Sequence, residues 1–176
     1  MNPKKYLLQA IRILSEKYPF EDITVDMILQ EADVSRGTFH KYYRDKYDLA
    51  NSYYSDYVSS EIVSHYNGHN WKQCLKEIFL FVKENRDYFR TVIINRNTAF
   101  LDFVSSFGLE GYQRVYMANM HIAEMSDEQI MESEFYNAGC VRILELWIMD
   151  ECRMPVDRLV QLSCTLMPDI YTRIAF

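Results

Sequence analysis

The sequence contains little glycine and little proline, with five Gly and four Pro in 176 residues, beside a hydrophobic content of 49%. A turn-rich all-β fold needs more of both residues, and a disordered chain has far fewer apolar ones. The chain is long enough to bury a core in one domain or in two small ones. We therefore expect an all-α fold.

Cysteine is also scarce, and its placement indicates neither a disulfide nor a metal site. The four cysteines are Cys74, Cys140, Cys152 and Cys164. No close pair and no metal-ligand spacing occurs among them. His65 and His69 are four residues apart, but Asn67-Gly68 lies between them and should keep them off a shared helical face. We expect reduced thiols and no bound metal.

The sequence lacks long apolar runs and the motifs of common enzymes. No segment approaches the length of a membrane span, and Met1-Asn-Pro-Lys-Lys5 leads directly into an amphipathic segment without a signal peptide. No Ser-His-Asp order, phosphate loop or dinucleotide fingerprint is visible. These features predict a cytoplasmic protein that has no membrane partner, is not an enzyme and needs no cofactor.

Charge is unevenly distributed along the chain. The net charge is -6, yet residues 1–50 hold eight Lys or Arg and eight Asp or Glu, so the negative excess lies in the remainder. DNA would repel an acidic region. Any nucleic-acid binding must therefore be confined to a local patch of the first 50 residues.

The segment from Thr24 to Tyr43 has the pattern of two short helices joined by a tight turn. Thr24 can cap the first helix, whose apolar residues Val25, Ile28, Leu29 and Ala32 share one face. Asp33 tolerates a left-handed backbone, Val34 can fill the corner, and Ser35 can cap the second helix. This pattern predicts a helix-turn-helix unit.

The second helix of this unit has a composition suited to DNA. Phe39 and Tyr43 are four residues apart and should face the core, which leaves the polar residues on other faces. Four cations lie between positions 36 and 46 against one acid, Asp45. They are Arg36, Lys41, Arg44 and Lys46. Asp26, on the outward face of the preceding helix, could accept a hydrogen bond from a cytosine amine or could simply be solvated.

The stretch from Ala32 to Leu49 resembles the helix-turn-helix signature of the TetR family of bacterial transcription regulators, with Thr24-Val25 as the usual opening. The resemblance implies a recognition helix from Ser35 to Tyr43 and a phosphate contact from Lys46. The residues expected to form the DNA interface are Thr24, Ser35, Arg36, Gly37, Thr38, His40, Lys41, Tyr42 and Lys46. We expect a DNA-binding domain over residues 1–46 and a regulatory and dimerisation domain over residues 47–176.

Helical periodicity continues outside this unit. A first helix is expected from Pro3 to about Tyr18, with Tyr6 and Tyr18 on its buried face. One uninterrupted helix from Lys46 to about Tyr66 should act as a stiff lever. The further expected helices are Trp71 to about Arg86, Tyr88 to Ile94, and about Asn97 to Met120, where Gly108 and Gly111 leave room for a kink or a break. The capping box Ser126 to Gln129 should open a helix that runs to about Cys152, and Pro155 should open the last one, which runs to about Ile174.

The last two helices are apolar around much of their circumference, which is more than one buried stripe requires. Packing against a second copy of the chain is the simplest way to bury this excess apolar surface, so we expect a homodimer through these helices. The TetR resemblance implies the same pairing, as a four-helix bundle. Phe79 to Arg86 and Tyr136 to Trp147 are similar to the subgroup that regulates dihydroxyacetone kinase operons.

Polar residues within the otherwise apolar second domain are candidates for a ligand pocket, because buried polar groups need partners. They are Asn95, Arg96, His121, Tyr136, Asn137 and Arg142. Each taken alone is more often a surface or interface residue. The expected function is a regulator, by resemblance a repressor, that binds double-stranded DNA at a palindromic operator under control of a small-molecule effector. The alternative is control by a protein co-regulator that binds the second domain.

Overall fold

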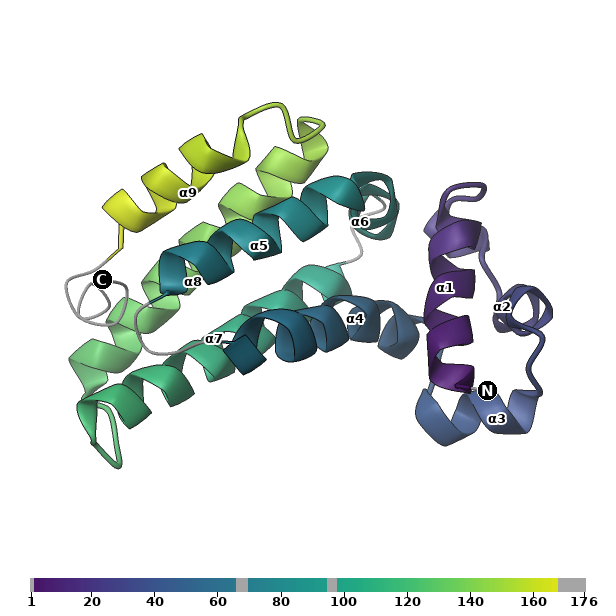
Figure 1. The fold of residues 1–176 in the computed structure, drawn as a ribbon, viewed down its shortest axis with the longest axis horizontal. Coiled ribbons are helices and arrows are strands. Elements are labelled where there is room, and N and C mark those ends of the chain that lie inside the picture. Colours follow the sequence, from purple (N-terminus) through teal and green to yellow (C-terminus); the bar gives the residue numbers. More distant parts are fainter. Residues whose placement is uncertain (1, 66–69, 95–97, 168–176) are drawn as a thin grey trace.

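The computed structural model describes residues 2–65, 70–94 and 98–167. Over these residues the chain is helical and contains no strand, which confirms the expected all-α fold. Figure 1 shows a small head formed by α1, α2 and α3 beside a larger body formed by α5 to α9, with α4 running from one into the other. No helix in the described part is both long enough and apolar enough to cross a membrane.

The head consists of α1 (Pro3–Ser15), a short 3-10 turn (Phe20–Asp22), α2 (Val25–Ala32) and α3 (Arg36–Tyr42). Its core buries one apolar face of each element. The fully buried side chains there are Leu7, Ile11, Phe20, Ile23, Ile28, Phe39 and Leu49. The expectation that Tyr6 and Tyr18 share the buried face of α1 is wrong, since both are over 40% exposed. The helix ends at Ser15, so Tyr18 lies beyond it.

The lever begins as α4 (Lys46–Tyr57) but does not continue as an α-helix to Tyr66 as predicted. A π-helical turn (Val58–Ile62) and a 3-10 turn (Val63–His65) follow, and Tyr66 lies outside the described residues. Ser60 donates from its hydroxyl to the Asp56 carbonyl (2.7 Å). Hydrogen bonds of this kind and β-branched residues such as Val58 both weaken the regular helix, although no Gly or Pro interrupts the sequence.

The body contains α5 (Trp71–Glu84), α6 (Arg86–Ile93), α7 (Thr98–Met120), α8 (Asp127–Met149) and α9 (Val156–Thr165). The capping box at the start of α8 is confirmed, because Ser126 and Gln129 each bond the other's backbone N–H. No break occurs at Gly108 or Gly111, because α7 continues as an α-helix through both glycines.

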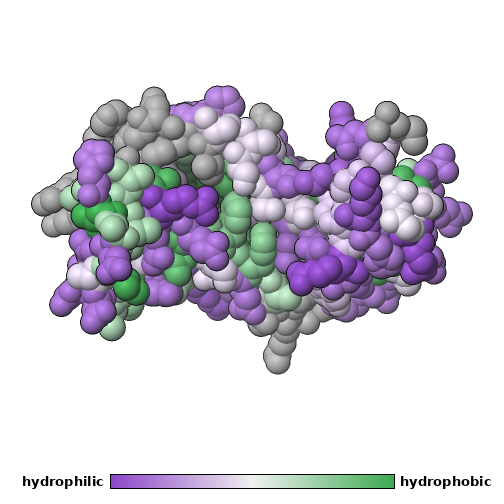
Figure 2. Space-filling model, turned by 90° about the horizontal axis from the view of Figure 1, so that it is seen from below, coloured by the Kyte–Doolittle hydropathy of each residue, from purple (hydrophilic) through white to green (hydrophobic). Residues whose placement is uncertain are grey.

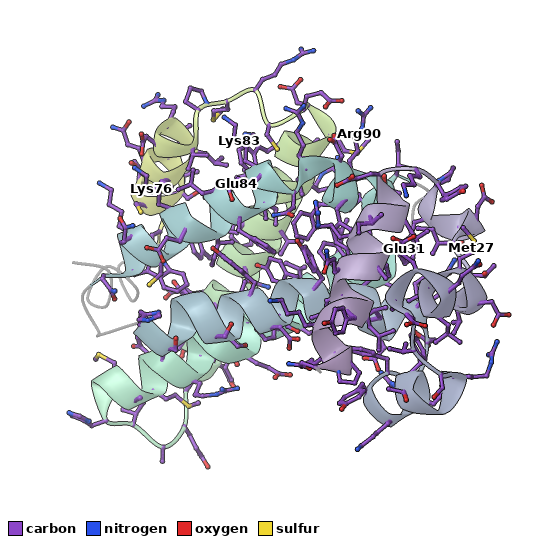
Figure 3. All side chains as sticks on the ribbon, turned by 45° about the vertical axis from the view of Figure 1, so that its right-hand side comes forward. Met27, Glu31, Lys76, Lys83, Glu84 and Arg90 are labelled. Atoms are coloured by element: carbon purple, nitrogen blue, oxygen red, sulfur yellow. The ribbon has the colours of Figure 1, made fainter. Side chains whose placement is uncertain are left out.

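Ion pairs join separate helices of the body. Lys76 on α5 pairs with Asp157 on α9 at 2.6 Å, and Arg90 on α6 pairs with Glu151 in the turn after α8. Figure 3 shows Lys76 on α5 and Arg90 on α6, the two basic partners. On the face seen in Figure 2, apolar residues reach the surface over the body, whereas the head is mostly hydrophilic.

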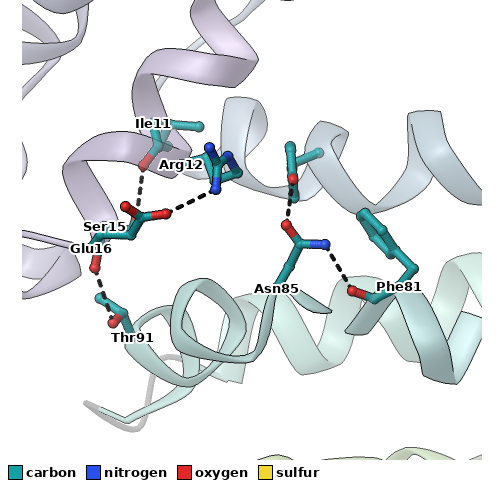
Figure 4. A network of polar contacts seen from close by, with 8 residues as sticks. Ile11, Arg12, Ser15, Glu16, Phe81, Asn85 and Thr91 are labelled. Atoms are coloured by element: carbon teal, nitrogen blue, oxygen red, sulfur yellow. Dashed lines mark hydrogen bonds and ion pairs between the residues drawn. The ribbon is translucent and has the colours of Figure 1, made fainter. Parts of the chain in front are cut away.

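The head rests on the body through α4 and α6. Thr91 on α6 donates to the Ser15 carbonyl at the end of α1 (3.4 Å), as Figure 4 shows. Tyr53 on α4 donates to Asn85 Oδ1 (2.7 Å), and Tyr88 on α6 donates to the Ala50 carbonyl (3.0 Å). The last two bonds tie α4 to α6 and to the turn before it, and the Thr91 bond ties α6 to the end of α1 in the head.

Candidate DNA interface and ligand cavity

The helix-turn-helix unit has the local geometry that its sequence predicts. Thr24 Oγ1 accepts from the Met27 N–H (3.2 Å), and Ser35 Oγ accepts from the Thr38 N–H (3.1 Å). Asp33 lies in the left-handed region at φ 52° and ψ 50°. Thr24 thus caps the start of α2, the left-handed Asp33 ends it, and Ser35 caps the start of α3, so the turn between the two helices is locally defined.

The faces of α3 divide as predicted. Phe39 is fully buried, and Tyr43, the residue that ends the helix, is 3% exposed. The polar candidates lie on the other side: Arg36, Gly37, His40, Lys41 and Tyr42 are exposed and Thr38 is half-buried. Lys41 lies over the ring of Tyr42, 5.9 Å from its centroid. The helix therefore presents an aromatic and cationic surface to solvent, as a DNA-reading helix requires.

Lys46 has a partner set that the sequence did not predict. Its ammonium donates to the carbonyls of Phe20 (2.9 Å), Glu21 (3.0 Å) and Ile23 (2.9 Å), and lies over the rings of Phe20 and Tyr47. All three N–H groups are thus bound to the turn that precedes α2. A contact with DNA phosphate would require these bonds to be exchanged. The structure therefore assigns Lys46 a part in fastening α4 to the head.

The basic excess counted along residues 36–46 is largely compensated in three dimensions. Arg36 forms an ion pair with Asp26 on α2, and Arg44 forms one with Asp48 (3.6 Å). Among the described residues no ion pair involves Lys41. A count along the sequence missed these acids because Asp26 lies ten residues before its partner and Asp48 just beyond the counted stretch.

A cavity that is partly open to solvent lies between α4 and the body, with two adjoining lobes of about 210 and 110 Å³. Residues of α4, α5 and α7 line both lobes. The shared residues are Tyr54, Trp71, Ile78, Gly108 and Tyr112. The larger lobe adds Val58 and Ser59 from the π-helical turn, and its charged residues are Glu110 and Arg114. The smaller lobe is closed by α8 and is almost wholly apolar.

Two of the six predicted ligand residues line this cavity. Tyr136 and Asn137 lie in the wall of the smaller lobe. The Asn137 amide donates to Ser105 (3.0 Å), and the Tyr136 hydroxyl donates to the Ser163 carbonyl (3.0 Å), so both side chains also join helices. Asn137 Oδ1 lies close to Gly108, at 3.2 Å from where a Cβ would stand.

The other four predicted ligand residues are not brought to the cavity. His121 is exposed just after α7, at φ 53°, and the exposed Arg142 pairs with Glu145. Asn95 and Arg96 lie outside the described residues. The residues that do line the cavity are mostly aromatic and aliphatic, and no spacing along the chain singles them out. One usable signal was the pair Gly108 and Gly111, which line the cavity and do not break α7.

The outer face of α8 and α9 exposes large apolar side chains. Phe135 is 85% exposed, Met131 73%, Leu166 65% and Leu146 51%. A shallow groove runs between the two helices beside them. Its lining residues are Phe135, Tyr136, Gly139, Cys140, Ile143, Ser163 and Leu166. An apolar surface of this kind on an otherwise polar protein is typical of a contact with another protein.

The four cysteines form no disulfide. Burial raises the pKa of each thiol above its usual value, to about 11 for Cys152. A thiol with a raised pKa is a poor nucleophile at neutral pH, because the thiolate is the reactive form. Within the described ranges, no group of three or more His, Cys, Asp or Glu side chains could hold a metal ion.

Comparisons with known proteins agree with this geometry. The family model described as "Bacterial regulatory proteins, tetR family" matches residues 7–53, and the model described as "Transcriptional regulator C-terminal region" (TetR_C_8) matches residues 69–169. No curated protein sequence matches the chain.

Several solved structures share the fold. The dihydroxyacetone kinase operon activator DhaS has a TM-score of 0.70 at 18% identity, covering 98% of this chain and 96% of DhaS. A TetR transcriptional regulator from Rhodococcus sp. RHA1 has a TM-score of 0.59 at 12% identity, covering 99% of each chain. The TetR family repressor AlkX from Dietzia sp. strain DQ12-45-1b has a TM-score of 0.57 at 14% identity, covering 98% of each chain. At these identities the likeness is one of fold.

Proposed function

Because the chain belongs to the TetR family of bacterial transcription regulators, we propose that it binds a palindromic operator in double-stranded DNA as a homodimer and releases it when a small molecule enters the body. We keep the division proposed from sequence, with the DNA-binding domain ending at Lys46. Two α3 helices related by two-fold symmetry would enter successive major grooves.

The surface of α3 is the observation that carries this proposal. A Cβ on Gly37 would meet only Ser35 Oγ, at 4.0 Å, so packing within the head does not require a glycine there. A close approach by an outside partner does favour one. Next to it, Thr38, His40, Lys41 and Tyr42 offer donors and an aromatic edge for bases and phosphates.

The exposed apolar face of α8 and α9 supports the homodimer. Phe135 and Met131 are exposed on the same helix, and Leu166 follows α9. An isologous contact would bury this face of both copies in a four-helix arrangement and would fix the distance between the two heads. A fixed distance between heads is what a palindromic operator selects.

The cavity supports control by an apolar effector. Its walls are mostly aromatic and aliphatic, and AlkX, one of the structures of similar fold, is described as implicated in the biodegradation of n-alkanes. Part of the cavity wall belongs to α4 and the π-helical turn after it, through Tyr54, Val58 and Ser59. At its other end, α4 begins with Lys46, which is hydrogen-bonded to the turn before α2. A ligand that displaces α4 would therefore change the spacing of the heads and the affinity for the operator.

Fluorescence anisotropy on the DNA that flanks the protein's own gene tests the proposal. We expect tight binding of two chains per site that resists random duplex and weakens steeply with salt. Binding no tighter than to random duplex would contradict it. We propose repression, as described for AlkX, although DhaS is described as an activator. Transcription from the operator in vitro, measured with and without the protein, shows whether the protein represses or activates.

A thermal shift assay separates an effector from a protein co-regulator. Decanol and decanoic acid are suitable probes, because both have an apolar chain and they differ in charge. A rise in melting temperature with either, lost when Gly111 is replaced by a bulky residue such as Phe in the larger lobe, supports the small-molecule proposal. A protein that co-purifies with the chain, with no response to either probe, would favour the co-regulator.

A further inference from the structure

An ion pair crosses the helix-turn-helix unit on its outer side. Asp26 lies in the first turn of α2, and Arg36 is the first residue of α3. The guanidinium of Arg36 donates to Asp26 Oδ1, although the residues are ten positions apart. The Asp26 side chain remains 77% exposed and the Arg36 side chain 56% exposed, so both lie at the surface of the head beside Gly37.

Stability gives little reason for this pair. Ion pairs between exposed side chains contribute little to stability, because water screens them and both side chains must be ordered. The left-handed Asp33 and the Ser35 cap already define the turn between α2 and α3 without the pair. Asp26 also places a negative charge where the head is to meet phosphates, which weakens binding to DNA of any sequence.

The pair does have a consequence for how Arg36 can bind a base. A guanidinium carries five N–H donors in a rigid plane, and a carboxylate that holds one edge leaves the others free. Two parallel donors match the O6 and N7 acceptors of guanine in the major groove. Holding the side chain beforehand reduces the conformational entropy lost on binding.

We propose that Asp26 is a positioning residue that orients Arg36 to read one guanine in each half-site of the operator. Asp26 then sharpens specificity in two ways. It favours the contact of Arg36 with guanine, and its charge opposes binding to sequences where that contact is missing. The inference rests on the proposed function, because it requires that α3 enters the major groove.

The experiment starts from a random-sequence duplex library, from which the wild-type full chain selects its site. Anisotropy then gives the affinity of each protein for the selected duplex, for duplexes with each base substituted symmetrically, and for random duplex. The variants are Asp26→Ala, Arg36→Ala and the double variant. Glu31→Ala is the matched control, because Glu31 is an exposed acid on the same helix (Figure 3), five residues after Asp26, and among the described residues the ion pair of Arg36 is with Asp26 and not with Glu31.

We expect the wild type to prefer guanine at one symmetric position by about tenfold. Asp26→Ala should reduce that preference to about twofold to threefold while raising the affinity for random duplex, since a negative charge is removed. Arg36→Ala should abolish the preference, and the double variant should show no more base preference than Arg36→Ala. Glu31→Ala should leave the preference unchanged. Melting temperatures of all four variants confirm that the head stays folded.

Three outcomes would overturn the inference. In the first, Asp26→Ala lowers affinity equally for every base at the position. In the second, it changes the preference no more than Glu31→Ala does. In the third, Arg36→Ala changes no base preference, which would show that Arg36 does not read a base. A wild-type chain that enriches no sequence would overturn the proposed function together with this inference, so the two failures are distinguishable.

Discussion

The head and the body of this protein place their functional residues in different ways. The proposed DNA interface lies entirely between Thr24 and Tyr42, on two short helices and the turn between them. The cavity draws its walls from α4, α5, α7 and α8, which are separated by up to 90 residues in the chain. A site built from neighbouring residues leaves a motif in the sequence, and a site built by packing distant helices does not.

The surfaces of the head and the body also differ in chemical character. On the head, charged side chains are compensated by nearby acids and carbonyls, as for Arg36 and Lys46. On the body, apolar side chains such as Phe135 remain uncovered. In the proposed homodimer, the second copy would cover this face of α8 and α9.

The largest effect is expected from a substitution that separates the two copies of the proposed homodimer. Phe135→Glu places a charge in the centre of the apolar face, and burying an unpaired charge is costly. We expect the dimer to become a monomer in sedimentation experiments and the affinity for the operator to fall about 100-fold, because only one head can bind at a time. Leu80→Glu, at a 38% exposed apolar residue of α5, is the control and should change neither property. A dimer that persists in Phe135→Glu contradicts the assignment.

The next effect concerns the junction of head and lever. Lys46→Met removes three hydrogen bonds from the turn at residues 20–23. We expect the free energy of unfolding to fall by about 2 kcal/mol, since bonds to a charged donor are strong but partly exposed here. The dependence of DNA affinity on salt should stay as in the wild type. A salt dependence reduced by about one phosphate contact would instead restore the phosphate role. Lys5→Met, at an exposed lysine of α1, is the control.

Gly37→Ala should act on stability and binding in opposite directions. Alanine favours helix over glycine, so urea unfolding should show a head stabilised by about 0.5–1 kcal/mol. The added methyl group would stand between α3 and the DNA, so the affinity for the operator should fall about tenfold, the size of one lost base contact. A variant that is more stable and binds as tightly as the wild type would show that α3 does not approach DNA at this residue.

The smallest effect compares two glycines of α7. A Cβ on Gly111 meets nothing within 4 Å, whereas one on Gly108 would lie 3.2 Å from Asn137 Oδ1. Gly111→Ala should therefore stabilise the protein by about 0.5–1 kcal/mol in urea unfolding. Gly108→Ala should gain less or lose stability, because α8 must shift. Equal gains would mean that the Asn137 side chain moves aside without cost.

Much of the head could be predicted from the sequence. Thr24, Asp33 and Ser35 determine their own backbone through local hydrogen bonds and conformational preference, and such signals depend on a few neighbouring residues. The pairing of Arg36 with Asp26 and the binding of Lys46 to three carbonyls could not be predicted in this way. Both depend on how α2, α3 and α4 are packed, which a count of charges along the chain does not contain.

Less of the body could be predicted. The apolar periodicity of the sequence predicts helices α5 to α9. The π-helical turn after Tyr57 could not be predicted, because no Gly or Pro marks it in the sequence. Polar residues were poor guides to the cavity, because the side chains of Tyr136 and Asn137 join helices while His121 and Arg142 lie elsewhere. An apolar cavity is lined by the same residue types as a core, so composition cannot separate the two.

The distance between the two heads is the most direct test of how head and body work together. We would insert about half a helical turn, five base pairs, between the half-sites of the selected operator and measure the anisotropy of the wild-type chain on both duplexes. A dimer joined through α8 and α9 holds its heads in one relative orientation, so affinity should fall about 100-fold because one half-site now faces away. Equal affinity for the two duplexes would contradict a homodimer whose body sets the spacing of its heads.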